Sequence, residues 1–291
     1  MFLNRWMKYL VCSVILGSFF LANSSAYAAS TVFVNGEYQH NSLTIEGRTW
    51  VPIRALSDKE WLVYAYDPKT RIASVHNKGN SITVQLRVGD KTATVNGKKV
   101  QLEAEVVNKN GLTYVPLRFI TETFGAHIEF NAKDDRVIVR TPTGQAQYET
   151  LMRGDLTEAR RIAFELARVN GEAPALQFGE GYHHYYYTFP EGEALRFTVS
   201  ASGYSEHYYE VNDEGLAIHK WQKDNVANRE WGKEPEFKSY VYFLDEFMAG
   251  LFTYGIVDSQ GNDTELGKFY YSEFKDTVIP IKGEKRTVIR P

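Results

Sequence analysis

The stretch Trp-Val-Pro-Ile-Arg-Ala-Leu at residues 50–56 returns 64 residues later as Tyr-Val-Pro-Leu-Arg-Phe-Ile at residues 114–120. Val34-Asn35-Gly36 precedes the first copy, and Val95-Asn96-Gly97 precedes the second. A repeat of this length indicates that one supersecondary unit is used twice. We therefore expect a duplicated domain over residues 31–142, and its repeated motif carries no group typical of an active site.

Each copy predicts a β-β-α-β-β unit with an antiparallel sheet packed on a short helix. The Asn-Gly pairs favour tight hairpin turns, because both residues accept positive φ angles. Pro52 and Pro116 suit the first helical position, where no backbone N–H is needed. In the second copy Gly125 is well placed to end the helix. Trp61 stands at that place in the first copy, so its helix must end differently.

The two repeated arginines, Arg54 and Arg118, allow two interpretations. Either could contact a ligand, or each could be fixed against carbonyls or a carboxylate and hold its helix on the sheet. We favour the structural role, and we class Pro52, Pro116 and Gly125 as structural too.

The repeat resembles the copper amine oxidase N-terminal-like domain, also called a stalk domain, found in exported proteins of Gram-positive bacteria. The second copy is the closer match, through Asn96-Gly97, residues 114–120, Gly125-Ala126 and Ile128-Glu129-Phe130. The resemblance implies a spacer or interaction module. It does not imply amine oxidase activity, because the chain has no His-x-His pair and no Asn-Tyr-Asp/Glu signature. We expect no cofactor.

The first 28 residues have the pattern of a signal peptide. Arg5 and Lys8 precede an apolar stretch over residues 9–21, and Ala26-Tyr27-Ala28 offers a cleavage site after Ala28. The single cysteine, Cys12, lies inside this segment. Because no later apolar or basic run follows, we expect neither a membrane nor a nucleic-acid partner after cleavage. The predicted location is secreted, either extracellular or associated with the cell wall.

Residues 147–291 predict a second α+β domain, a helix followed by an antiparallel sheet. Asp155 and Glu158 form a capping-box-like pair before a periodic apolar stripe. Strands are expected after residue 177, with partly helical structure over residues 240–256 and a short helix near residues 264–274. This element order is similar to that of PepSY-like modules of exported bacterial proteins.

Most of the 19 tyrosines lie in this second domain. On a strand, Tyr185 and Tyr187 share one face, and Tyr182 and Tyr186 share the other. One face should be core, and the other could be an exposed platform for sugar rings or a protein. The alternative is cross-strand packing of the aromatic rings. The candidate binding residues are Tyr182, Tyr185, Tyr186, Tyr187, Tyr208 and Tyr209.

Two further groups could carry chemistry. His183, His184, His207 and His219 could bind a metal if strands align them, but adjacent residues point to opposite faces, so we expect no metal site. Ser272-Glu273-Phe274-Lys275 matches the Ser-x-x-Lys of serine acyl enzymes, yet the companion Ser-Asp-Asn and Lys-Thr-Gly motifs are absent.

These observations predict a secreted, non-enzymatic binding or scaffold protein of the cell envelope. The stalk domain would present the Tyr-rich domain to a cell-wall polymer or an extracellular protein. The alternative is a secreted hydrolase whose active site is assembled in the second domain from dispersed Asp, Glu or His residues.

Overall fold

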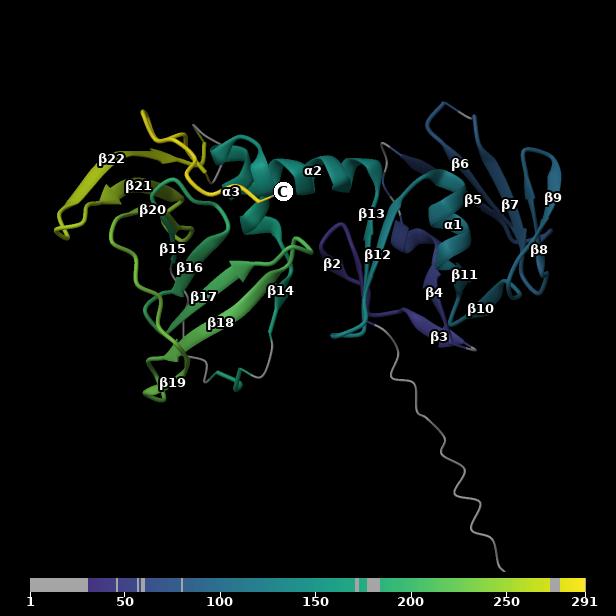
Figure 1. The fold of residues 1–291 in the computed structure, drawn as a ribbon, viewed down its shortest axis with the longest axis horizontal. Coiled ribbons are helices and arrows are strands. Elements are labelled where there is room, and N and C mark those ends of the chain that lie inside the picture. Colours follow the sequence, from purple (N-terminus) through teal and green to yellow (C-terminus); the bar gives the residue numbers. More distant parts are fainter. Residues whose placement is uncertain are drawn as a thin grey trace, which may run out of the picture.

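The computed structural model describes residues 31–45, 47–56, 58, 61–79, 81–170, 173–176, 184–272 and 278–290. The predicted signal peptide lies outside them. The chain forms two units of mostly antiparallel sheet, with helix α2 (Pro142–Arg153) running between them (Figure 1). The predicted α+β class is confirmed. No helix in the described part of the chain is long and apolar enough to span a membrane.

The first unit repeats one order of elements: two hairpins, a helix and a third hairpin. The first copy consists of β1 (Thr31–Val34), β2 (Glu37–Tyr38), β3 (Leu43–Ile45), β4 (Arg48–Pro52), the 3-10 helix η1 (Ile53–Leu56), β5 (Leu62–Asp67) and β6 (Ile72–Asn77). The second consists of β8 (Thr92–Val95), β9 (Lys98–Gln101), β10 (Val107–Lys109), β11 (Leu112–Pro116), α1 (Leu117–Phe124), β12 (His127–Asn131) and β13 (Arg136–Arg140). Strand β7 (Thr83–Arg87) lies between the copies.

Each copy therefore has one hairpin more than the predicted β-β-α-β-β unit. In the second copy the missed hairpin turns at Asn110 and Gly111, whose φ angles are 52° and 76°. These are the angles of the Asn-Gly turn that was recognised at residues 35–36 and 96–97. The Asn-Gly turn signal is present at residues 110–111, but the flanking strands β10 and β11 are too short to show an alternation of polar and apolar residues.

The repeated motif pairs with its own copy. Strands β4 and β11 are antiparallel neighbours, with Trp50 opposite Pro116, Val51 opposite Val115 and Pro52 opposite Tyr114. Val51 thus faces its own equivalent 64 positions later, and the flanking pairs are related by a local pseudo-twofold axis near the Val51–Val115 pair.

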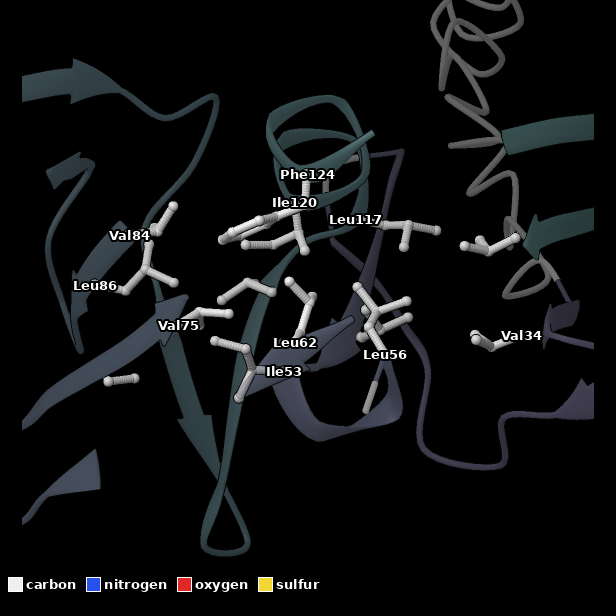
Figure 2. Close-up of a cluster of buried hydrophobic side chains, with 14 of the residues drawn as sticks. Val34, Ile53, Leu56, Leu62, Val75, Val84, Leu86, Leu117, Ile120 and Phe124 are labelled. Carbon is white, nitrogen blue, oxygen red and sulfur yellow. The ribbon is translucent and has the colours of Figure 1, made fainter. Parts of the chain in front are cut away.

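The copies also exchange hairpins around this axis. The sheet β12-β13-β1-β2 joins the last hairpin of the second copy to the first hairpin of the first copy. The sheet β5-β6-β7-β8-β9 makes the converse exchange, with β7 inserted between the copies. Both copies then supply one core, in which Ile53, Leu56 and Leu62 meet Leu117 and Ile120 (Figure 2).

The helix boundaries correct two sequence assignments. Pro52 and Pro116 are the last residues of β4 and β11, and the helices begin one residue later. Pro116 is the N-cap, with φ −59° and ψ 122°, because it still pairs with Trp50 in the sheet. Gly125 ends α1 in the left-handed region as predicted, at φ 76°. In the other copy, buried Trp61 donates an indole hydrogen bond of 3.2 Å to the Phe124 carbonyl.

The second unit is a nine-stranded sheet under two helices. Its elements are α2, α3 (Leu156–Glu165), β14 (Arg168–Val169), β15 (Tyr185–Pro190), β16 (Arg196–Ala201), β17 (Ser205–Val211), β18 (Ala217–Asp224), β19 (Arg229–Gly232), β20 (Tyr240–Glu246), β21 (Leu251–Val257) and β22 (Asp263–Tyr270). The order is β14-β18-β17-β16-β15-β20-β21-β22, and β19 pairs with β18. The face that packs on α2 and α3 is called the helix-facing face below.

The helical expectations for residues 240–256 and 264–274 are wrong. The first range forms the hairpin β20–β21, and the second falls largely on β22. The Asp155 cap is confirmed, since its side chain accepts a 3.0 Å hydrogen bond from the Glu158 N–H. Helix α3 ends at Glu165, with Leu166 as its C-cap.

The two units share a polar joint centred on Glu214. This buried carboxylate lies 3.0 Å from Arg136 Nε, bonds to the Asn131 amide, and accepts a 3.0 Å bond from Asn212. The Glu214 carbonyl also accepts a 3.0 Å bond from Arg140. Beside it, Phe33 and Ile138 pack on Leu216.

The start of α2 connects the two units. Its N-cap Thr141 accepts a 3.1 Å bond from the Gly144 N–H, and its backbone N–H donates to the Asn35 side chain at 2.9 Å. The two units are therefore joined without a flexible stretch in the described residues.

The C-terminal segment lies along both helices (Figure 1). Arg286 donates to the carbonyls of Leu151 and Gly154 at the end of α2, and Arg290 donates to the Val211 carbonyl at 2.8 Å. Glu284 forms a buried ion pair with Arg160 of α3 at 2.7 Å.

Candidate functional site

Strand β15 places its three tyrosines as the alternation predicts. Tyr185 and Tyr187 lie on the helix-facing face with Phe189, where Tyr187 contacts Phe164 of α3 at 4.5 Å between ring centroids. Tyr186 lies on the opposite face and stacks on Tyr242 at 5.4 Å. All three are half-buried, and Tyr182 lies outside the described residues.

Tyr208 and Tyr209 are not part of an exposed platform. Each is only 6% exposed, and the two point to opposite faces of β17. Tyr208 donates to Glu210 at 2.7 Å and is covered by Phe237. Tyr209 stacks between Phe197 and His219. For these two residues, cross-strand packing is the correct interpretation, because their strand lies in the middle of the sheet.

An aromatic group gathers instead at one end of the helix-facing face. Tyr185 lies 5.7 Å from Phe247 and 6.1 Å from Tyr187, measured between ring centroids. Tyr271, which follows β22, is 41% exposed and donates a hydrogen bond to Asp245. We call these four rings, Tyr185, Tyr187, Phe247 and Tyr271, the aromatic rim.

Asp245 lies at the centre of the aromatic rim. It is the residue directly opposite Tyr185 in the β15–β20 pairing, and it is half-buried. Burial raises the pKa of Tyr187 to about 12, and the negative charge of Asp245 adds to that shift. Burial and the hydrogen bond to Asp245 likewise raise the pKa of the Tyr271 phenol. Both phenols are therefore neutral donors at neutral pH.

Sequence reasoning found Tyr185 and Tyr187 but missed Asp245, Phe247 and Tyr271. All three missed residues lie in or next to segments that were expected to be helical. In the sequence, the two apolar strands around the Phe247–Gly250 turn resemble a single run, because that turn has only a weak signal, Ala249-Gly250. Recognising this hairpin would have placed Asp245 beside β15.

A second cluster surrounds Arg168 on the same face. Its guanidinium stacks over Phe197 and Tyr209 and donates to the Ala163 and Leu166 carbonyls at 3.1 and 2.9 Å, at the C-terminus of α3. A cation at this helix end is favoured by the helix dipole. These bonds give Arg168 a structural role.

Next to Arg168, His207 and His219 meet with 3.2 Å between ring nitrogens. The condition that a metal site would need, alignment on neighbouring strands, is thus met for these two histidines. His184 directly precedes β15, and His183 is outside the described residues. In the described ranges, no three His, Cys, Asp or Glu side chains are grouped to hold a metal ion.

The histidine pair predicts a pH-dependent stability. Burial, together with His219 and Arg168, lowers the pKa of His207 to about 4. Between about pH 6.5 and 4, the unfolded chain binds a proton at His207 that the folded chain does not, so stability falls as pH falls. We expect a loss of about 2–3 kcal/mol across this window, measured by urea unfolding.

The control for this loss is a matched histidine substitution. His207→Gln should remove about half or more of the pH dependence, whereas His40→Gln, at an exposed site in the first unit, should leave it unchanged. An unaltered slope in His207→Gln would show that this side chain is not the proton acceptor.

Comparisons with known proteins identify the first unit. Residues 33–139 match the copper amine oxidase N-terminal domain. The first unit belongs to this family. A comparison of the whole chain with curated proteins gave no match.

In amine oxidases the copper amine oxidase N-terminal domain is a non-catalytic domain. The match ends at residue 139, at the end of β13, so the second unit with the aromatic rim lies beyond it.

Within the copper amine oxidase N-terminal domain, the repeated arginines are exposed. The Arg118 side chain is 69% exposed and lies 4.0 Å from Glu122, one turn along α1. Arg54 is exposed and borders a pocket of about 140 Å³ with Tyr64 and Tyr66. Neither arginine fixes its helix on the sheet as predicted, because both are on the solvent side of their helices.

The Ser-x-x-Lys motif at residues 272–275 lies largely outside the described residues. A different serine contacts a histidine: Ser205 Oγ lies 3.2 Å from His207 Nε2. The other ring nitrogen of His207, Nδ1, lies 3.2 Å from His219 Nε2. Serine, base and orienting group in this order are typical of a serine nucleophile, although Ser205 is only 5% exposed.

Proposed function

We propose that this chain is a secreted, non-enzymatic binding protein of the cell envelope. The copper amine oxidase N-terminal domain acts as a stalk, and the aromatic rim of the second unit binds a cell-wall polymer or an extracellular protein. The observation that carries the proposal is the grouping of four half-buried or exposed rings around one carboxylate. Such rings stack on sugar faces while the carboxylate and phenols bond to hydroxyl groups.

The joint at Glu214 supports the stalk role. Asn131 and Arg140 of the first unit donate hydrogen bonds to Glu214, and Arg136 is ion-paired with it. Arg140 also stacks on Tyr148 of α2 at 3.9 Å. A joint with several charge-assisted hydrogen bonds holds one domain at a fixed orientation to the other. The signal-peptide pattern of residues 1–28 supports export.

The test is co-sedimentation of residues 29–291 with Gram-positive cell-wall sacculi. We expect saturable binding by the wild type and a loss of at least about tenfold in affinity in Tyr185→Ala/Tyr271→Ala, since stacked rings each contribute on the order of 1 kcal/mol. Phe130→Ala is the matched control, because Phe130 is a 60% exposed ring on the first domain. Wild-type protein that stays in the supernatant would overturn the wall proposal.

A secreted hydrolase is the second candidate, supported by the Ser205–His207–His219 chain. A hydrolase would cleave a wall polymer or an activated ester, and Ser205→Ala would abolish that cleavage. Equal product formation by wild type and Ser205→Ala, or none by either, would remove this candidate.

A further inference from the structure

Asp245 differs from three buried or half-buried carboxylates of the second unit that are ion-paired with arginines. Glu284 pairs with Arg160 at 2.7 Å, Glu193 with Arg196 at 2.7 Å, and Asp224 with Arg229 at 2.9 Å. Among the described residues, no Lys, Arg or His lies within 4.0 Å of Asp245. Its hydrogen-bond donor is the Tyr271 phenol, which is neutral.

The surroundings of Asp245 are aromatic on several sides. Tyr185 lies opposite it on β15, Phe247 follows two residues later, and Tyr187 and Tyr271 complete the rim. The face of an aromatic ring carries a partial negative charge and attracts cations. A half-buried carboxylate inside such a ring set therefore has a local potential that favours a positive ligand.

In the described part of the chain, no ion pair places a Lys, Arg or His on Asp245. Arg168, a cation on the same helix-facing face, stacks over Phe197 of β16 and Tyr209 of β17. Strand β15 separates those strands from β20, which carries Asp245. The guanidinium is also held by the carbonyls at the end of α3.

We propose that the aromatic rim and Asp245 form a binding site for an organic ammonium group, the carboxylate neutralising its charge and the rings contacting its alkyl surface. The inference rests on the proposed function, and it names the chemical class of the group that the envelope ligand would present. Primary amines on wall polymers or peptides and quaternary ammonium groups share this chemistry.

The first experiment titrates the mature chain with tetramethylammonium and with n-butylammonium at constant ionic strength. Chemical shifts of the Tyr185 and Tyr271 rings are followed by NMR. We expect saturable shifts with one or both cations, and little shift with the neutral isostere tert-butanol. Asp245→Asn should weaken binding at least about tenfold, because it removes the negative charge that neutralises the ammonium group.

The matched control is Glu265→Gln, an exposed carboxylate on β22 of the same sheet. It should leave the affinity unchanged, and an unaltered amide spectrum of Asp245→Asn shows that this variant folds. Absence of saturable shifts in the wild type, equal shifts with tert-butanol, or full affinity in Asp245→Asn would each overturn the inference.

The sacculus assay separates this inference from the proposed function. Sacculus binding that is lost in Tyr185→Ala/Tyr271→Ala but unaffected by tetramethylammonium and by Asp245→Asn would overturn the ammonium site and leave the envelope role standing. Saturable ammonium binding without sacculus binding would support the site and overturn the wall role. The two cations distinguish a primary from a quaternary ligand group.

Discussion

Replacing Glu284 with glutamine is expected to lower the free energy of unfolding by about 3–5 kcal/mol. The Arg160 side chain is 2% exposed, and that of Glu284 is 5% exposed. Both carboxylate oxygens accept bonds of 2.7 Å from the guanidinium, and one also accepts a 2.7 Å bond from the Gly192 N–H. Glutamine keeps the shape but leaves a buried positive charge without its counterion. Urea unfolding followed by circular dichroism measures the change.

Glu158→Gln is the matched control. Its partner Arg161 is 31% exposed and Glu158 is 48% exposed, so this pair should be worth less than about 1 kcal/mol. The double variant Arg160→Met/Glu284→Leu should recover much of the lost stability, because it removes both buried charges. A Glu284→Gln variant within about 1 kcal/mol of wild type would contradict the assigned role of the pair.

Replacing Glu214 with alanine is expected to cost about 3–4 kcal/mol and to loosen the joint between the two units. The side chain is 7% exposed and lies 3.0 Å from Arg136 Nε. Its removal leaves the Asn212 amide without its carboxylate partner, whereas the Asn131 amide keeps a 3.2 Å hydrogen bond to Asp134. Arg136 keeps its contact with Asp134, which limits the loss. In scanning calorimetry, we expect the thermal transitions of the two units to lie further apart than in the wild type.

Glu129→Gln is the control for Glu214→Ala, because it changes an exposed carboxylate beside the joint between the units. Glu129 is 46% exposed and lies 3.6 Å from Arg140, so its replacement should cost less than about 1 kcal/mol. If Glu214→Ala unfolds with the same midpoint and the same transition shape as the wild type, the joint does not couple the units.

Local signals in the sequence predicted local structure well. The Asn-Gly turns, the Gly125 helix end and the Asp155 cap are each decided by the conformational freedom or hydrogen bonding of one or two residues, and all three are confirmed. The repeat predicted a duplicated scaffold, because an internal repeat can be recognised in the sequence without knowing which strands pair. The alternation of β15 correctly separated Tyr186 from Tyr185 and Tyr187.

Non-local arrangements could not be predicted from those signals. The positions of Pro52 and Pro116 depend on the pairing of β4 with β11, which holds each proline in the sheet. Whether Tyr209 is core depends on its place in the middle of a nine-stranded sheet, under Arg168 and beside His219. Asp245 is a candidate binding residue only because it lies directly opposite Tyr185 in the sheet, although the two are 60 residues apart in the chain.

The hairpin exchange in the first unit has a consequence for the origin of the domain. The first hairpin of the first copy pairs with the last hairpin of the second, and β7 bridges the other two hairpins, so a chain with one copy alone would leave both hairpins without these neighbours. Such a chain could complete its sheets only by associating with an identical chain about the axis at Val51 and Val115. Duplication and fusion would then turn a symmetric dimer into a monomeric domain, with β7 as the segment that accommodates the join.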